Sequence, residues 1–535
     1  MSLDLLFHGG EVITVDPQNS ICSAVGIRGD RIVYVGDEGG ARNLVTPGTQ
    51  VVDLKGRGLV PGFIEAHCHV LGWGTYINGL DLKAASSVSE VASLVGDMSQ
   101  DVPKGEWIRG RGYNQLNLEE RRHPNRWDLD AAAPHHPVYL VRCCGHITVA
   151  NSRALELAGL KDDSPDPPGG VMDRDDRGRL NGVLRETAQH PVRTAGEIPE
   201  ETLREHYSAG CADLIRWGIT SAHDMGRPVT AETLASWHRA DRIPLRVFAT
   251  LSPDDEHLLP DRGGSITYLG GDLFFRFGHL KVFADGSSSG PTAATREPYA
   301  CDPGDRGVVV TSQEEITSWF TRANGMGFSV TAHAVGDRGI EMTLAGQEAA
   351  SKDRPRRGVN GEYSSVPRHR IEHCAMAFPD LRKRMKALSL IPAGQAIFLE
   401  EYGDNYLNDY GPQRAESMFP LKSFLREGIP VALSSDAPVS HPDPLKGLAA
   451  AMNRRTRAGQ VLGPGERLTL QEAIRCYTLH GAYAEHAEDL KGSIQVGKLA
   501  DLAVVNGPLA EAGPDEVAEM RVDMTVVGGQ VQYQR

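Results

Sequence analysis

Cysteine is scarce and dispersed in this sequence. Only eight cysteines occur in 535 residues, and they form no CxxC pair. The adjacent Cys143 and Cys144 do not have the spacing of a metal-binding clip. A scaffold held together by disulfides is therefore excluded, and we expect a protein of the reducing cytoplasm.

Three further absences narrow the class of protein. No apolar run approaches the length of a membrane span, and the first residues lack the basic and apolar regions of a signal peptide. No basic block offsets the net charge of −14, which argues against a nucleic-acid partner. Neither a GxxxxGKS/T loop nor a GxGxxG motif after a predicted strand marks a nucleotide site. We therefore expect a soluble intracellular protein with neither a membrane nor a nucleic acid as partner.

The middle of the chain alternates short β-rich runs with helical stretches. Eight strands are predicted, at residues 59–70, 219–224, 245–251, 279–285, 328–333, 369–373, 390–396 and 430–436. Amphipathic or polar segments, such as 313–325 and 378–388, lie between them. An alternation of strand and helix repeated eight times predicts an α/β fold of the (β/α)₈ TIM-barrel type rather than an open sheet.

Both ends of the chain and one long connection depart from this alternation. Residues 5–35 and 497–531 show the pattern of short antiparallel strands with tight turns, one of them at Gly9-Gly10. We expect a small β-sandwich domain built from residues 1–60 and 487–535. About 150 residues separate the first two barrel strands, far more than a βα loop needs. Residues 83–199 are predicted to form a subdomain over the barrel mouth, with 61–82 and 200–486 as the barrel.

Metal-binding residue types stand at the predicted ends of the barrel strands, where TIM barrels place their chemistry. They are His67, His69, His333, His373 and Asp436, and the fourth predicted strand carries Lys281. Side chains two apart in a strand share a face, so the first two imidazoles point inward together. Imidazole and carboxylate are the ligands that zinc takes in catalytic sites, which keep one position for water. The sequence therefore predicts a zinc site at the barrel mouth.

These residues and their flanking motifs resemble the amidohydrolase superfamily, and more narrowly its amidohydrolase-3 group. The matching motifs are PGFIEAH (61–67), GITSAHD (218–224), KVFADG (281–286), HAVGD (333–337), RIEH (370–373), SDAP (435–438) and GKLAD (497–501). That group includes N-substituted formamide deformylases. The resemblance covers essentially the whole chain. It implies a metal-dependent hydrolase that cleaves an amide-type C–N bond of a small molecule, with the six residues above as metal ligands.

The resemblance also implies a role for Lys281, because binuclear members carry a lysine in the matching strand. Its amine reacts with CO₂ to give a carbamate that bridges two zinc ions. The carbamate, Asp436 and a bridging hydroxide supply about three negative charges to balance the two dications. A single-metal site is the alternative. A zinc-activated hydroxide then attacks the carbonyl carbon, and Asp436 is the expected general base that later protonates the leaving amine.

Three residues are candidates for substrate binding. His146 and Arg185, in the predicted insertion, match places where the group carries similar residues, and His223 ends the second predicted strand. A core or surface role is the alternative for each. The expected partner is a small-molecule substrate, and a homo-oligomer such as a dimer is left open.

Other functions are weighed against amide hydrolysis. A deaminase or a carbamate or ester hydrolase fits the same fold. Single-metal deaminases of the superfamily usually carry a glutamate three residues after the strand-five histidine, whereas this chain has Gly336 there. A non-enzymatic relative would have lost metal ligands, and all six candidates are present here.

Overall fold

The computed structural model describes residues 2–226, 229–253, 255, 272–288, 290–352 and 367–535. The chain divides into two compact units, Met1–Val70 with Cys211–Arg535, and Leu71–Gly210. The first unit holds the barrel and both chain ends. The second is the segment of chain between the first and second barrel strands. Among the residues described, no helix has the length and apolar character that a membrane span requires.

Eight parallel strands form the barrel sheet, in chain order. They are β6 (Phe63–Cys68), β13 (Ile219–Asp224), β14 (Arg246–Leu251), β15 (Phe275–Phe283), β16 (Val330–Ala334), β17 (Arg370–His373), β18 (Ile391–Gly394) and β19 (Ala432–Leu433). The first and last strands meet through backbone hydrogen bonds from Asp436 to His67 (2.9 Å) and from His69 to Ala437 (2.8 Å). These bonds close the ring, and the predicted TIM barrel is confirmed.

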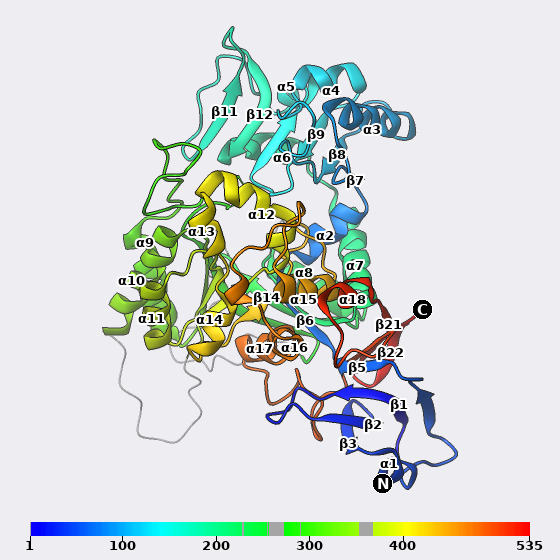
Figure 1. The fold of residues 1–535 in the computed structure, drawn as a ribbon. Helices are drawn as coiled ribbons and strands as arrows, with labels where there is room; N and C mark the ends of the chain where they lie inside the picture. Colours follow the sequence, from blue (N-terminus) through cyan, green and yellow to red (C-terminus); the bar gives the residue numbers. More distant parts are fainter. Residues whose placement is uncertain (1, 227–228, 254, 256–271, 289, 353–366) are drawn as a thin grey trace. The chain divides into compact units, whose positions relative to one another are not determined.

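Helices alternate with the strands, and several line the outside of the barrel in Figure 1. They include α8 (Ala231–Ala240), α9 (Gln313–Met326), α10 (Asp337–Lys352), α11 (Pro379–Leu388), α12 (Ile397–Tyr410), α13 (Pro412–Glu416), α14 (Leu421–Arg426), α15 (Pro444–Asn453), α16 (Leu470–Cys476) and α17 (Leu479–Ala484). The sequence of α9 explains its limits. The Ser312 hydroxyl caps its start by accepting from the Glu315 amide (3.2 Å), and Gly327 ends it with a φ of 72°. Ile316, Phe320 and Ala323 recur on one face and are buried.

Both chain ends contribute strands to one further sheet. Its strands are β1 (Leu5–Ile13), β2 (Ile21–Arg28), β3 (Arg31–Gly36), β4 (Gln50–Asp53), β5 (Gly58–Pro61), β20 (Leu502–Val505), β21 (Val522–Val527) and β22 (Gln530–Gln534). The order is β22-β21-β20-β5-β1-β2-β3, with β4 paired to β1, so the antiparallel β5–β20 pair joins the two ends. The blue and red strands of Figure 1 show this meeting. Phe7, Val25, Leu502 and Val526 belong to its shared core.

Two local predictions are wrong, both at glycines. The stretch 59–70 is two strands, because β5 belongs to the terminal sheet and β6 to the barrel. Between them the Gly62 amide donates to the Asp501 carbonyl (2.8 Å). Gly9-Gly10 is not a turn but lies inside β1, where Gly9 has a φ of 75° and the register with β2 shifts. Glycine permits this backbone angle without a side-chain clash, so the strand continues through an irregularity.

The second unit has its own sheet and core, and residues 83–199 fall within it. The sheet order is β11-β12-β10-β9-β8-β7, with β7 (Leu80–Asp81), β8 (Ile108–Arg111), β9 (Val138–Val141), β10 (Ile147–Ala150), β11 (Gly170–Arg174) and β12 (Leu180–Glu186). The helices are α2 (Val70–Ile77), α3 (Val88–Asp101), α4 (Arg126–Ala132), α5 (Ser152–Leu157) and α6 (His190–Ala195), before α7 (Glu200–Arg216). Val91, Leu129, Leu140 and Val149 are buried together in its core.

Candidate metal centre

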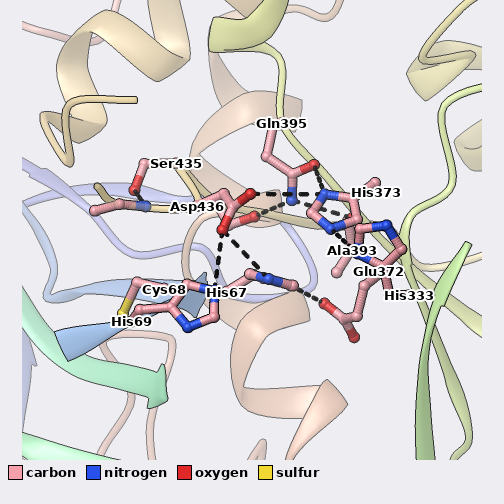
Figure 2. A network of polar contacts seen from close by, with 12 residues as sticks. His67, Cys68, His69, His333, Glu372, His373, Ala393, Gln395, Ser435 and Asp436 are labelled. Atoms are coloured by element: carbon pink, nitrogen blue, oxygen red, sulfur yellow. Dashed lines mark hydrogen bonds and ion pairs between the residues drawn. The ribbon is translucent and has the colours of Figure 1, made fainter. Parts of the chain in front are cut away.

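Five of the six predicted ligands converge at the carboxyl ends of the barrel strands. They are His67, His69, His333, His373 and Asp436, and Figure 2 shows Asp436 linked to imidazoles of both histidine pairs. Nε2 of His67 and Nε2 of His69 lie 3.4 and 3.5 Å from Oδ1 of Asp436. The ligand atoms of these three residues all lie within 4.8 Å of one another.

Hydrogen bonds fix which nitrogen of the first histidine pair carries a proton. Nδ1 of His67 lies 2.5 Å from a carboxylate oxygen of Glu372, and Nδ1 of His69 lies 3.2 Å from the carbonyl oxygen of Gly226. Both partners only accept, so each Nδ1 donates and each Nε2 presents a lone pair. Two lone pairs and the Asp436 oxygen therefore face one another. The three residues form a donor set that fits a cation.

The second pair repeats this arrangement. Nδ1 of His373 donates to Oε1 of Gln395 (2.9 Å), since the amide nitrogen of Gln395 already donates to Oγ of Ser434 (2.8 Å). Nε2 of His333 donates to the Gly286 carbonyl (3.1 Å). The remaining nitrogens of His373 and His333 are then 3.0 Å apart with lone pairs facing. Two acceptors at this distance repel unless a cation lies between them, so the donor set fits a second ion.

Lys281 lies in β15 inside the barrel and is 4% exposed. Burial lowers its pKa to about 8, although the charges of Glu372 and Asp436 oppose this. The structure therefore places the Lys281 amine close enough to these carboxylates for their charges to act on it. This is the sixth predicted ligand.

The backbone conformation also sets the direction of two predicted ligands, His373 and Asp436. His373 and Asp436 have φ angles of 67° and 58°, in the left-handed region that non-glycine residues rarely adopt. Each costs on the order of 1 kcal/mol and persists only where surrounding contacts impose it. Glu65 supplies such a contact, because its carboxylate accepts from the Ser435 amide (2.9 and 3.1 Å) beside Asp436. Burial raises the pKa of Glu65 to about 8.

Three supporting residues escaped the sequence prediction. Glu65 and Glu372 lie inside barrel strands, and Gln395 follows β18. Glu65 and Glu372 had a signal, since a charged side chain in a buried barrel strand needs a buried partner. Gln395 lies one residue before the end of the predicted strand 390–396, close to the position that selected the histidines. Glu372 contacts His67, Gln395 contacts His373, and Glu65 accepts from the Ser435 amide beside Asp436.

The structure does not place His223 where a substrate contact was expected. Its side chain is 0% exposed, Nδ1 lies 2.7 Å from Nη1 of Arg370, and Nε2 lies 3.5 Å from a carboxylate oxygen of Glu485. His223 is thus buried between the charged side chains of Arg370 and Glu485. Burial lowers its pKa to about 4. Its position indicates a structural role.

His146 and Arg185 lie in the second unit. Nδ1 of His146 contacts Oε2 of Glu186 at 2.8 Å, where Glu186 ends β12. Arg185 makes a two-pronged ion pair with Asp173 on the neighbouring strand (2.9 and 2.7 Å). Burial opposes protonation of His146, but the Glu186 carboxylate raises its pKa above the usual range. The substrate-binding role of both residues stays a prediction.

Comparison with known proteins agrees with this site. A sequence model of the amidohydrolase family matches residues 50–533. The chain is 29% identical to a Bacillus subtilis protein named as an amidohydrolase, YtcJ, with 99% of each chain covered. It is also 29% identical to the N-substituted formamide deformylase of Arthrobacter pascens, over 99% of this chain and 98% of that one. A solved structure of a metal-dependent hydrolase from Pyrococcus furiosus, 27% identical, matches with a TM-score of 0.71 over 94% of this chain and 98% of that one. With a cluster of histidines and an aspartate at the strand ends of a closed barrel, this chain belongs to the amidohydrolase family of metal-dependent hydrolases.

Proposed function

We propose that this protein is a two-zinc hydrolase of an amide-type C–N bond in a small molecule, such as an N-substituted formamide or an N-acyl compound. The observation that carries the metal proposal is the pair of histidine groups whose lone pairs face one another. Imidazole nitrogens and one carboxylate are ligands that zinc prefers in catalytic sites. The formamide deformylase, similar over the full length, supports the choice of bond.

The proposed chemistry divides between the metal and the protein. Zinc held by the histidines and Asp436 would supply a water of lowered pKa and would polarise the scissile carbonyl. Asp436 accepts the proton of the attacking water and returns it to the leaving amine, which leaves badly as an anion. The neutral amine of Lys281 adds to CO₂ and loses one proton, which leaves a carbamate anion. That anion supplies the negative charge that two dications need.

A deaminase is the weaker alternative on this fold. The expected deaminase glutamate falls at Gly336, where an added Cβ would lie 1.9 Å from the backbone oxygen of Ala294. A glutamate there would displace backbone, so this position cannot supply the acid of a single-metal deaminase. A non-enzymatic role is disfavoured because the structure brings five candidate ligands together, with the sixth beside them.

Metal stoichiometry tests the proposed function directly. Elemental analysis of protein made in zinc-replete medium should give about two zinc equivalents per chain, because each histidine pair presents lone pairs for one ion. The full-length protein, dialysed without chelator, is the sample. A reproducible value near one would support the single-metal alternative, and it would remove the reason for a bridging carbamate.

Phe283 indicates the kind of substrate. Its side chain is 41% exposed, and its ring lies 5.2 Å from the His333 ring and 5.3 Å from Nζ of Lys281. An exposed aromatic ring beside the reacting position favours an apolar group on the substrate. We therefore propose that the substrate carries an apolar substituent close to its scissile bond. Residues 83–199, including His146 and Arg185, are proposed to set the rest of the substrate range.

Phe283→Ala tests this assignment. We expect KM for an N-hexyl formamide to rise by about 5–30-fold, because about 1–2 kcal/mol of apolar contact is lost. KM for N-methylformamide should stay nearly unchanged. Phe274→Ala is the matched control, since Phe274 is 36% exposed and precedes the opposite end of the same strand. An equal rise for both formamides would show that Phe283 does not contact the substituent.

A further inference from the structure

Glu372 lies behind the candidate metal centre and touches one of its histidines. Its side chain is fully buried, and Oε2 lies 2.5 Å from Nδ1 of His67. The other ring nitrogen of His67 faces Asp436. Glu372 therefore contacts the candidate ligand through the nitrogen that does not take part in the lone-pair cluster.

Two side chains hold the Glu372 carboxylate in place. Arg370 donates to both oxygens, from Nε to Oε1 (2.8 Å) and from Nη2 to Oε2 (3.0 Å). Oγ1 of Thr331, on the neighbouring strand, also donates to Oε1. Charged hydrogen bonds are strong where water is excluded. The carboxylate cannot turn away from His67 without breaking one of them.

Arg370 is anchored in turn on its far side. It donates from Nη1 to Nδ1 of His223 (2.7 Å) and from Nη2 to the Ala66 carbonyl (2.6 Å). A guanidinium cannot accept, so His223 carries its proton on Nε2, which faces Glu485 at 3.5 Å. A buried network thus runs from His67 through the barrel interior to Glu485, next to the C-terminal end of α17.

We propose that Glu372 is a positioning residue that holds His67 in its Nδ1–H tautomer and aims the Nε2 lone pair at the metal. This inference rests on the metal centre proposed above. A carboxylate partner also makes the opposite ring nitrogen more basic and hence a better ligand. An amide in its place offers an NH₂ group that can face Nδ1. That contact selects the tautomer with its proton on Nε2, which cannot bind a metal through that atom.

Zinc affinity measures this role without recourse to turnover. Full-length protein is prepared metal-free, and Zn²⁺ is partitioned between it and a chromophoric chelator. We expect Glu372→Gln to weaken zinc binding by about 10–100-fold, the range found when outer partners of metal ligands are removed. Glu372→Asp, which keeps the charge, should recover part of the loss. Thr331→Val removes only one hydrogen bond to Glu372 and should also weaken zinc binding. This variant tests the same role if Glu372→Gln fails to fold.

A double-mutant cycle separates positioning from a purely structural role. If Glu372 acts through His67, Glu372→Gln has no further effect on zinc affinity in a His67→Ala background. A residue that only stabilises the barrel would lower zinc affinity by the same factor in both backgrounds. Equal factors in the two backgrounds would overturn the inference.

Asp501→Asn is the matched control. Asp501 is also a buried carboxylate, paired with Arg246 through two hydrogen bonds (2.7 and 3.0 Å) outside the candidate centre. Its replacement should lower the thermal stability and leave zinc affinity unchanged. Wild-type affinity in Glu372→Gln would overturn the positioning role alone. Failure of the wild-type protein to bind zinc would overturn the proposed function first, so the two failures are distinguishable.

Discussion

Asp436→Asn should lower kcat by about 10²–10⁴-fold, the usual contribution of a general acid–base group. The amide fills the same space but accepts a proton poorly. Asp436 stands between the two histidine pairs, and its Oδ2 lies 3.9 Å from Nδ1 of His373. From this position, we propose, it reaches both the attacking water and the leaving amine. The measurement is kcat on an N-substituted formamide, with zinc content determined on the same sample.

Asp443→Asn provides the comparison for this variant. Asp443 is buried in the segment that follows Asp436 and caps α15 by accepting from the Leu445 amide (3.0 Å). Asparagine caps a helix about as well as aspartate, so activity should be retained. If Asp436→Asn kept its zinc and most of its turnover, another residue would be the base.

Lys281→Ala should leave the protein metal-poor, with kcat/KM reduced by about 10³-fold or more, because the proposed carbamate would be lost. The truncated side chain leaves a space inside the barrel. Acetate or formate is small enough to enter it and to supply the missing carboxylate. We expect partial recovery of activity and zinc content when zinc and a short carboxylate are added together.

Two further measurements complete the test of the Lys281 carbamate. One uses the Lys281→Arg variant, and the other adds bicarbonate to the metal-free protein. The guanidinium stays charged, fills the space and forms no carbamate, so this variant should not recover with acetate. Zinc loading of the metal-free wild-type protein should rise when bicarbonate is supplied, whereas loading of Lys281→Ala should not respond. Full activity of Lys281→Ala without added carboxylate would contradict the carbamate proposal.

The fold was predictable from the sequence because barrel strands are apolar runs of the right length between helices. Residues 219–224 were predicted to the residue as β13, and 245–251 nearly so as β14. The predicted strand ends were less accurate where the chain passes from one sheet to another, as at Gly62 between β5 and β6. The eighth strand is only Ala432–Leu433, so Asp436 follows the strand instead of ending it.

The convergence of the predicted ligands at the strand ends was predictable from the sequence, whereas the side chains that contact them were not. Histidines at strand ends share a chemical preference that one sequence displays. The role of Glu372 depends on a hydrogen bond across the barrel to His67, between residues far apart in the chain. The buried surroundings of His223 were not predictable for the same reason, because its partner Arg370 belongs to a strand far away in the chain. Pairings of this kind are set by the closed ring and not by any local pattern.

The barrel closes through the backbone of the same residues that supply candidate ligands. His67 and His69 are bonded on one side of the seam, and Asp436 and Ala437 on the other. During synthesis the segment with His67 and His69 is made early. It can form these hydrogen bonds only after nearly the whole barrel has been synthesised. A nascent chain therefore contains only one of the two segments that close the barrel. The candidate metal centre is complete only when the eighth strand has been made. A bound ion would then stabilise the strand pair of greatest sequence separation in the barrel, whose closure costs the most chain entropy of the strand pairs. Metal would thus bind only to a chain whose barrel has closed.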